Sequence, residues 1–184
     1  MRLLYNKQAF FFKHMKNTTR NLIVFSGIVV FILGLVWLAS IGKSGTNSVT
    51  QYSQSFLSGS GQHYDFGTIA MDNGTVEREF ELKNEGVESV VINKVYTSCM
   101  CTTAYIYDAR NKEYGAFGMP GHGGGSSSTS VVVNAGESAR VKAVYDPAAH
   151  GPSGVGLAER SVYVETNSAQ SPKIELSFRA MVTR

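Results

Sequence analysis

The sequence contains little cysteine: of its 184 residues, only Cys99 and Cys101 carry a thiol. Small domains that depend on disulfides for their stability carry several pairs, so the chain is not a disulfide-stapled scaffold. The folded part must instead be held by a hydrophobic core. The roughly 120 residues after residue 62 are enough to bury one.

The sequence also lacks a recognisable catalytic motif. It contains no His-Glu-x-x-His, no Gly-x-Ser-x-Gly and no phosphate-binding Gly-x-x-x-x-Gly-Lys-Ser/Thr pattern. Its most regular carboxylates, Glu77, Glu79 and Glu81, alternate along a predicted strand, which is typical of a solvent-facing side. These absences predict a protein that is not an enzyme.

Positive charge is scarce in the predicted folded part, although the whole chain has a formal net charge of +3. Residues 1–20 contain five basic and no acidic residues, which leaves 12 basic and 14 acidic residues in residues 21–184. Domains that bind nucleic acid need a clustered basic surface on the fold. The distribution of charge therefore predicts that no nucleic acid is a partner.

One long hydrophobic run, residues 21–41, contains no charged residue. As a helix it would span about 30 Å, the thickness of the hydrocarbon core of a bilayer. Because five basic residues precede the run and only Lys43 follows it closely, residues 1–20 are predicted to form a cytoplasmic tail. We therefore expect a single transmembrane helix at residues 21–41, in contact with the lipid bilayer of the inner membrane. The rest of the chain would be displayed outside the cytoplasm.

A cleaved signal peptide is the alternative for this run. The apolar region of a signal peptide is about 7–15 residues long, which is shorter than the run seen here. Ser40-Ile41-Gly42 offers a small-x-small cleavage site. The length of the run favours an anchor that is retained.

The remainder of the chain divides into a linker and a β domain. Residues 42–62 are rich in Gly and Ser and lack hydrophobic periodicity, which predicts a flexible linker. Residues 63–184 contain short alternating runs separated by turn residues. Such runs predict an all-β fold, an antiparallel Ig-like β-sandwich preceded by the transmembrane helix. About eight strands are expected, at residues 64–69, 75–82, 89–96, 102–107, 130–133, 139–145, 160–166 and 173–182.

Local turn chemistry suggests how the first two of these strands are joined. Asp72-Asn73-Gly74 lies between them, and Asn-Gly tolerates the positive φ angles that a type I′ turn requires. This dipeptide predicts a tight β-hairpin.

A series of motifs runs through the predicted domain in a fixed order. The motifs are Tyr64-Asp-Phe-Gly-Thr-Ile69, Phe80-x-Leu-x-Asn84-x-Gly86, Ser98-Cys-Met-Cys-Thr102, Gly136-Glu137, Val144-Tyr-Asp-Pro147 and Thr166-Asn167. This series resembles the bacterial family called domain of unknown function 1573. The resemblance implies an Ig-like sandwich in an exported or membrane-anchored protein, and it implies no particular activity. The chain departs from the family pattern at Met100, where glycine is common, and by a Gly/Ser-rich insertion after the cysteine strand.

Cys99-Met100-Cys101 is the motif with the most chemistry, and three readings of it stay open. Both thiols can pack as small apolar groups at a strand end. Residues i and i+2 of a strand share a face, so the two sulfurs can also form a disulfide. Cα atoms about 6.5–7 Å apart would lie at the upper limit for such a bond, which would be strained and readily reduced.

The third reading is a soft metal site. Thiolates favour Cu(I) or Zn(II). Met119 and His122 lie in one glycine-rich loop and His150 lies in another, so the candidate ligands are Cys99, Cys101, Met119, His122 and His150. Cysteine, methionine and histidine together suit copper, the one cofactor that the sequence suggests.

Two hypotheses about function follow. The leading one is a non-enzymatic, membrane-anchored binding or assembly module of the cell envelope, which recognises an envelope protein through edge strands and end loops. The alternative is copper binding or thiol redox chemistry at Cys99-Met100-Cys101. The identity of the partner and the oligomeric state do not follow from the sequence.

Overall fold

A computed structural model describes residue 22 and residues 24–35, 52–122 and 125–184. The chain divides into two units, Met1–Ser48 and Val49–Arg184, and each is considered by itself. In the first unit, residue 22 and residues 24–35 are helical, and their large apolar side chains are exposed. No helix within the described residues is both long and apolar enough to cross a membrane. The predicted tail 1–20, the rest of the predicted anchor and residues 42–51 of the predicted linker lie outside the described residues.

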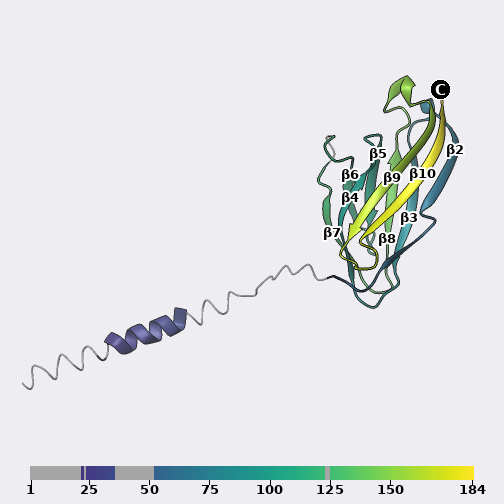
Figure 1. Ribbon diagram of the computed structural model, residues 1–184. Coiled ribbons are helices and arrows are strands. Elements are labelled where there is room, and N and C mark those ends of the chain that lie inside the picture. The colour runs from purple at the N-terminus through teal and green to yellow at the C-terminus, as the bar shows by residue number, and fades with distance from the viewer. Residues whose placement is uncertain (1–21, 23, 36–51, 123–124) are drawn as a thin grey trace, which may run out of the picture. The chain divides into compact units, whose positions relative to one another are not determined.

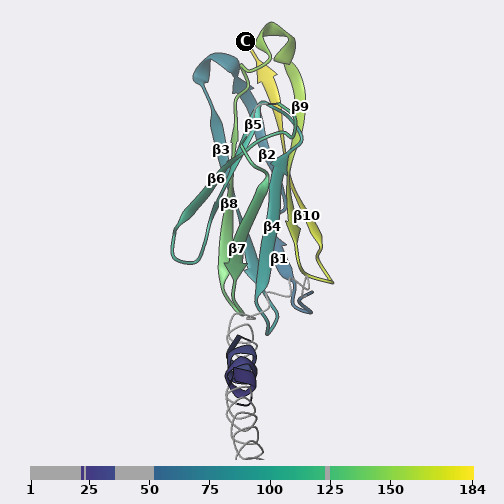
Figure 2. The same ribbon diagram turned by 90° about the vertical axis from the view of Figure 1, so that its left-hand side faces the viewer.

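The second unit is a sandwich of two five-stranded sheets (Figures 1 and 2). One sheet has the order β1 (Leu57–Ser60), β3 (Val76–Asn84), β8 (Ser138–Tyr145), β5 (Thr102–Tyr107) and β6 (Glu113–Phe117). The other has the order β2 (His63–Ala70), β10 (Lys173–Thr183), β9 (Gly156–Thr166), β4 (Val90–Thr97) and β7 (Ser128–Val133). Two short 3₁₀ helices, η1 (Met71–Asn73) and η2 (Gly151–Gly154), lie in the connections before β3 and β9.

The core lies between the sheets and follows the alternation of the strands. In β10 the side chains of Ile174, Leu176, Phe178 and Ala180 are buried, and the residues between them face outward. Since successive side chains of a strand point to opposite faces, this pattern places one face of β10 in the core. The prediction of a two-sheet, mostly β fold is confirmed.

The sandwich begins before residue 63, inside the range predicted as linker. Leu57 in β1 is 3% exposed, and β1 pairs antiparallel with β3. Gly61 has φ 66°, a conformation that glycine adopts readily. At this residue the chain leaves β1 and crosses to the other sheet, where it continues as β2. The Gly/Ser-rich composition hid a short strand that contributes a single buried aliphatic side chain.

Two details of the predicted topology are wrong. The sandwich is not wholly antiparallel, because β2 pairs parallel with β10, from His63↔Ser177 to Ala70↔Thr183. The hairpin expected at Asn73-Gly74 does not form, because β2 and β3 lie in different sheets. Asn73 ends η1 and Gly74 has φ 82°, so the dipeptide does turn the chain. The turn leads into the opposite sheet rather than to a neighbouring strand.

Asn84, at the end of β3, ties three segments of the chain together. Its side-chain amide donates to the carbonyl oxygens of Glu88 at 2.8 Å and Val133 at 2.9 Å, and accepts from the Gly86 amide at 3.0 Å. A Cβ atom at Gly86 would overlap Ser55, so glycine is required there. The motif Asn84-x-Gly86 is thereby explained as structural.

We expect Asn84→Ala to destabilise the domain by about 2–3 kcal/mol. The residue is 0% exposed, so the substitution leaves buried donors and acceptors without partners. Urea unfolding of the full chain measures the change. Asn93→Ala, at an exposed position of β4, is the matched control and should stay within about 0.5 kcal/mol of wild type. Equal losses in the two variants would contradict the role of Asn84.

Candidate functional site

The cysteine motif lies in a turn that joins the two sheets. Cys99, Met100 and Cys101 connect β4 of one sheet to β5 of the other. The amide of Thr102 donates to the Cys99 carbonyl at 3.2 Å, and the Thr97 hydroxyl shares its one proton between the carbonyls of Cys99 at 2.9 Å and Thr102 at 3.0 Å. Because Thr97 and Thr102 are both buried, the turn is held firmly from the core side.

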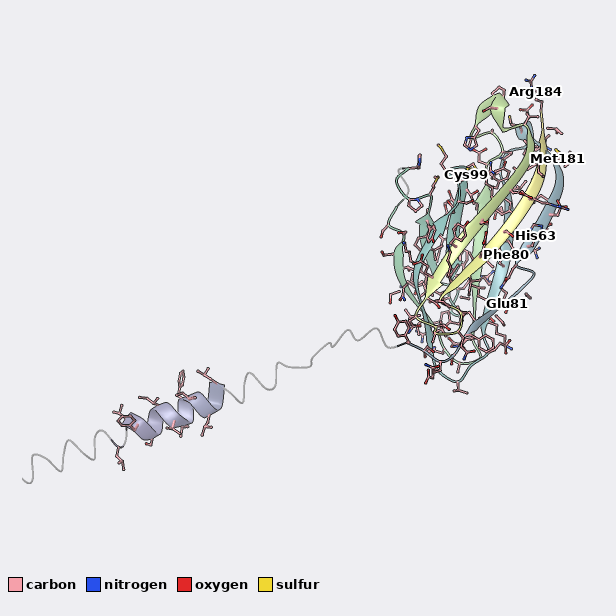
Figure 3. All side chains as sticks on the ribbon, viewed as in Figure 1. His63, Phe80, Glu81, Cys99, Met181 and Arg184 are labelled. Carbon is pink, nitrogen blue, oxygen red and sulfur yellow. A yellow bond between two sulfur atoms is a disulfide. The ribbon has the colours of Figure 1, made fainter. Side chains whose placement is uncertain are left out.

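Neighbouring strands of both sheets hold the same turn. On the side of β9, the Ser98 amide donates to the Ser161 carbonyl, and the Ser161 amide donates to the Ser98 hydroxyl, both at 2.9 Å. On the side of β8, the Asp146 amide donates to the Cys101 carbonyl at 2.9 Å. The cysteines therefore have a fixed backbone at the end of the sandwich. Figure 3 shows Cys99 in the half of the domain that carries the C-terminal Arg184, with Glu81 toward the opposite end.

Cys99 and Cys101 form a disulfide. Their Cα atoms are 5.3 Å apart, closer than the separation expected for an extended pair and within the usual range for such bonds. The difference arises because the motif occupies a turn rather than a strand. Cys101 is 3% exposed, whereas Cys99 is only half-buried, so an incoming group meets Cys99 first.

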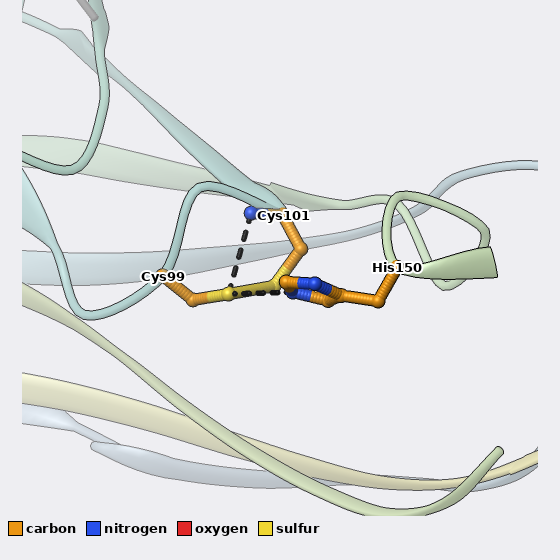
Figure 4. A group of neighbouring side chains, drawn as sticks. All are labelled: Cys99, Cys101 and His150. Atoms are coloured by element: carbon orange, nitrogen blue, oxygen red, sulfur yellow. Dashed lines mark hydrogen bonds between the residues drawn. A yellow bond between two sulfur atoms is a disulfide. The ribbon is translucent and has the colours of Figure 1, made fainter. Parts of the chain in front are cut away.

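His150 reaches the disulfide from the connection between β8 and β9. Its Nε2 atom lies 3.2 Å from Cys99 Sγ (Figure 4). The connection is ordered by its own hydrogen bonds: the Ala148 amide donates to Asp146 Oδ1 at 2.8 Å, and the Ser153 hydroxyl donates to the His150 carbonyl at 2.7 Å. An exposed imidazole is thus held against the more accessible of the two sulfurs.

Arg160 contacts the other sulfur. Its Nε atom donates to Cys101 Sγ at 3.0 Å, and its Nη1 atom donates to the Glu159 carbonyl at 2.7 Å. No carboxylate of the described chain lies within ion-pair distance of this guanidinium. A half-buried cation without an anionic partner is suited to a site where negative charge develops.

Arg160 is the site residue that the sequence reasoning missed. The alternation of β9 gave a signal, because Ala158 and Val162 are buried and Arg160 lies between them on the same side of the strand. A charge in the inward register of a strand requires a partner. Here the partner is Cys101 Sγ.

Tyr145 lies in the core beneath Arg160. Its ring centroid is 6.0 Å from the guanidinium carbon, and it stacks at a tilt against Phe178. Burial raises the pKa of the Tyr145 phenol above its ordinary value of 10.0; the Arg160 cation opposes this rise and the Asp146 carboxylate adds to it. The phenol therefore stays protonated in the folded domain at neutral pH.

The structure brings together three of the predicted ligands, Cys99, Cys101 and His150. One potential ligand atom from each of Cys99, Cys101 and His150 lies within 4.8 Å of the others. His122 is not part of this group. Met119 follows Gly118, whose carbonyl accepts from the Thr97 amide at 3.2 Å, so the loop that carries Met119 runs beside the turn. His63 lies in β2, with Nδ1 3.0 Å from the Ser177 hydroxyl.

The group can act chemically in two ways. A disulfide flanked by a cation can exchange with a thiol, because the cation stabilises the thiolate that leaves. In the reduced form, two sulfurs and an imidazole are ligands for a soft metal. Both actions use the same two sulfur atoms, so they cannot occur at once.

The fold and the comparisons agree on the class of protein. The domain is a mostly β, two-sheet sandwich, and the similarity to a solved structure agrees with this fold. Residues 57–114 match the model of the family described as protein of unknown function (DUF1573). The resemblance inferred from the motif series is thereby confirmed over this segment. No curated protein matches the chain.

Solved structures with similar folds come from varied sources. A protein of unknown function from Porphyromonas gingivalis W83 superposes with a TM-score of 0.53 at 16% identity, over 74% of this chain and 51% of that chain. This chain thus spans about half of that protein. The ASH/PapD-like domain 7 of human CEP192 gives 0.42 at 15% identity, over 78% and 96% of the two chains. The YadV chaperone gives 0.42 at 11% identity, over 70% and 52%. Identities this low show the fold alone.

We expect the stability of the domain to fall as the pH rises above about 10, in part through Tyr145. Its pKa is raised in the folded state, whereas the unfolded chain exposes a phenol of ordinary pKa. Between the two pKa values the unfolded chain has lost the proton and the folded chain has kept it, so the equilibrium moves toward unfolding. The contribution of the protonated phenol is complete below the unfolded pKa and is lost as the pH rises through the folded pKa.

Urea unfolding of wild type and Tyr145→Phe at about pH 8 and pH 11 measures this contribution. The loss of stability between the two pH values should be smaller in Tyr145→Phe. Tyr52→Phe, at an exposed position, is the control and should lose as much as wild type. A loss in Tyr145→Phe as large as that of wild type would contradict the role of Tyr145.

Proposed function

We propose that the sandwich is a thiol–disulfide exchange module of the cell envelope, which delivers the Cys99–Cys101 disulfide to the thiols of an envelope protein. The observation that supports it is the contact between Cys101 Sγ and the guanidinium of Arg160, which lacks a carboxylate partner in the described chain. The domain is itself the reactant in this exchange. The proposal is therefore compatible with the expected absence of an enzyme activity.

The exposure of the two sulfurs assigns their roles. A partner thiolate attacks Cys99 Sγ, the more accessible atom, and forms a mixed disulfide with it. The bond to Cys101 breaks, and Cys101 Sγ leaves with the electron pair as a thiolate beside the Arg160 guanidinium. A second thiol of the partner then attacks the partner sulfur of the mixed disulfide and releases Cys99. The partner is oxidised to a disulfide, and two electrons and two protons reduce the cysteine pair.

The electrostatic surroundings support this direction of attack. Cys101 is almost wholly buried, and a thiolate there would be costly without a nearby cation. Arg160 is such a cation, and its Nε–H group already points at the sulfur. A hydrogen bond from a charged donor is worth about 1.5–3 kcal/mol. Attack at Cys101 would instead release Cys99 as the thiolate, which is not the sulfur that Arg160 Nε contacts.

We expect Arg160→Met to slow the exchange and to make the reduction potential of the pair more negative by about 30–60 mV. This shift corresponds to the loss of a charged hydrogen bond, because about 30 mV equals 1.4 kcal/mol for a two-electron couple. Equilibration of the full chain with dithiothreitol buffers, followed by counting of free thiols, measures the potential. Arg160→Lys, which keeps the charge, should recover part of the shift.

The control for this measurement is Arg110→Met, at an exposed arginine of the connection between β5 and β6. It should leave the potential unchanged. A potential equal to wild type in Arg160→Met would overturn the role of Arg160.

Mass mapping of the mixed disulfide shows which cysteine the partner thiol attacks. A partner thiol trapped on Cys101 rather than Cys99 would refute the proposed direction of attack.

The same proposal puts the module at the inner membrane, with residues 21–41 as the anchor, residues 1–20 in the cytoplasm and residues 42–51 as the tether, because Ser53 and Ser55 are already buried in the sandwich. Disulfides persist outside the cytoplasm, so a module that delivers one belongs there. The charge-free run and its basic flank support this orientation. The exposed apolar side chains of residues 24–35 are consistent with contact with lipid.

We expect the full chain to stay in the membrane fraction after alkaline extraction, and its β domain to be digested by protease added to spheroplasts. Intact vesicles with the cytoplasmic face outward should protect the domain. The N-terminus of the purified chain should begin near Met1. Recovery of the chain in the alkaline extract, or a mature N-terminus close to residue 42, would favour a cleaved signal peptide over a retained anchor.

A further inference from the structure

We infer that the reduced form of this site binds one Cu(I) ion through Cys99 Sγ, Cys101 Sγ and His150 Nε2. The inference rests on the proposed function only for the reaction that supplies the reduced pair. Three potential ligand atoms of the right chemistry lie within 4.8 Å of one another at the end of a rigid sandwich. Thiol exchange has no evident need of the imidazole, whereas a metal ion has a direct use for it.

The geometry requires little rearrangement once the disulfide is reduced. Two sulfurs bound at about 2.3 Å to one three-coordinate metal lie about 4 Å apart, and a sulfur and an imidazole nitrogen lie about 3.7 Å apart. Cys99 Sγ and His150 Nε2 are already 3.2 Å apart. The two sulfurs must separate by rotation of their side chains, while the hydrogen bonds of Thr97 keep the backbone of the turn in place.

The ligand set favours Cu(I) over Zn(II). Thiolates are soft ligands that select Cu(I), and Cu(I) accepts three ligands, whereas zinc sites are almost always four-coordinate. In the described chain, no other His, Cys, Asp or Glu joins the group. The assignment uses neither Met119 nor His122.

Charge gives a second reason for a monovalent ion. Two thiolates, one Cu(I) ion and the guanidinium of Arg160 sum to zero. With Zn(II) the same groups carry a net positive charge of one. Since Cys101 is almost wholly buried and an uncompensated charge there is costly, the neutral combination is favoured.

Reduction and loading balance as two separate steps. First, two partner thiols reduce the disulfide and become a disulfide themselves, which leaves two thiols on the domain. The two thiols then release two protons and bind Cu(I) without any change in the oxidation state of the metal. Oxidation of the pair by another disulfide would remove both sulfurs from the metal, so the redox state of the pair decides whether copper is held.

Cu(I) titration of the full chain in detergent tests the inference, with bicinchoninic acid as the competing chelator. The chain is reduced with a phosphine, which is removed before titration under nitrogen, so the test does not depend on thiol exchange. We expect one Cu(I) per reduced chain and none per disulfide-bonded chain. Cys99→Ser/Cys101→Ser should bind none. His150→Gln should weaken binding by at least about tenfold.

His122→Gln and His63→Gln are the matched controls and should bind as wild type does. Unchanged affinity in His150→Gln, or a loss in His122→Gln as large as in His150→Gln, would overturn the assigned ligands. Equal Cu(I) retention by the reduced chain and the double serine variant would end the copper inference and leave the exchange proposal intact. If thiols fail to reduce the cysteine pair but the chain binds Cu(I) after phosphine reduction, the exchange proposal alone is overturned.

Discussion

The crossing of the chain from β4 to β5 is the constraint on which the candidate site depends. These strands belong to different sheets, so their connection has to close one end of the sandwich within four residues, from Ser98 to Cys101. The buried hydroxyl of Thr97 makes this possible, because it satisfies carbonyl groups at the start and the end of the turn. A rigid turn at the junction of two sheets brings three elements together. It holds the disulfide, faces the connection that carries His150 and lies against the strand that carries Arg160. The chemistry of the site is therefore a consequence of how the sandwich is closed.

Two of the motifs that gave the family resemblance, Asn84-x-Gly86 and the cysteine motif, lie at opposite ends of β8. In the register of the first sheet, Leu82 pairs with Ala139 and Val76 pairs with Tyr145, while Thr102 also pairs with Tyr145. Asn84, which follows Leu82 in β3, therefore lies near the start of β8, and the cysteine turn lies near its end. The amides and carbonyls around Asn84 are satisfied within the fold, including the Gly136 amide, which donates to the Asn84 carbonyl at 3.0 Å. The cysteine end instead presents a half-buried sulfur, an exposed imidazole and a cation that forms no ion pair with a carboxylate in the described part of the chain. The residues at the Asn84 end are thus explained by the stability of the fold, whereas those at the cysteine end are not.

The sequence predicted the parts of the fold that depend on local alternation and missed those that depend on distant partners. The buried residues of β10 followed from period-two alternation alone. The Asn73-Gly74 turn was recognised as a turn, but no local signal says that β3 pairs with β1 and β8 instead of β2. β1 and β6 escaped detection because they are short and contain Gly59 and Gly115.

At the site, residue type was enough to propose Cys99, Cys101 and His150. It also proposed His122, which does not join the group, and it passed over Arg160, whose role appears only when β9 is packed against the cysteine turn.

Arg160 links the two activities that we propose for the site. In the disulfide state the two sulfurs are neutral, so desolvation of the half-buried guanidinium is not offset by any carboxylate of the residues that the structure describes. A thiolate at Cys101 supplies that anion, and two thiolates that share one Cu(I) ion leave a site of zero net charge. The cation therefore destabilises the disulfide relative to both reduced forms. A domain built only to keep a structural disulfide would not need a cation at this position, because a neutral or apolar side chain would fill the inward register of β9 at lower cost. The presence of an arginine there is best understood if the cysteine pair spends part of its time reduced.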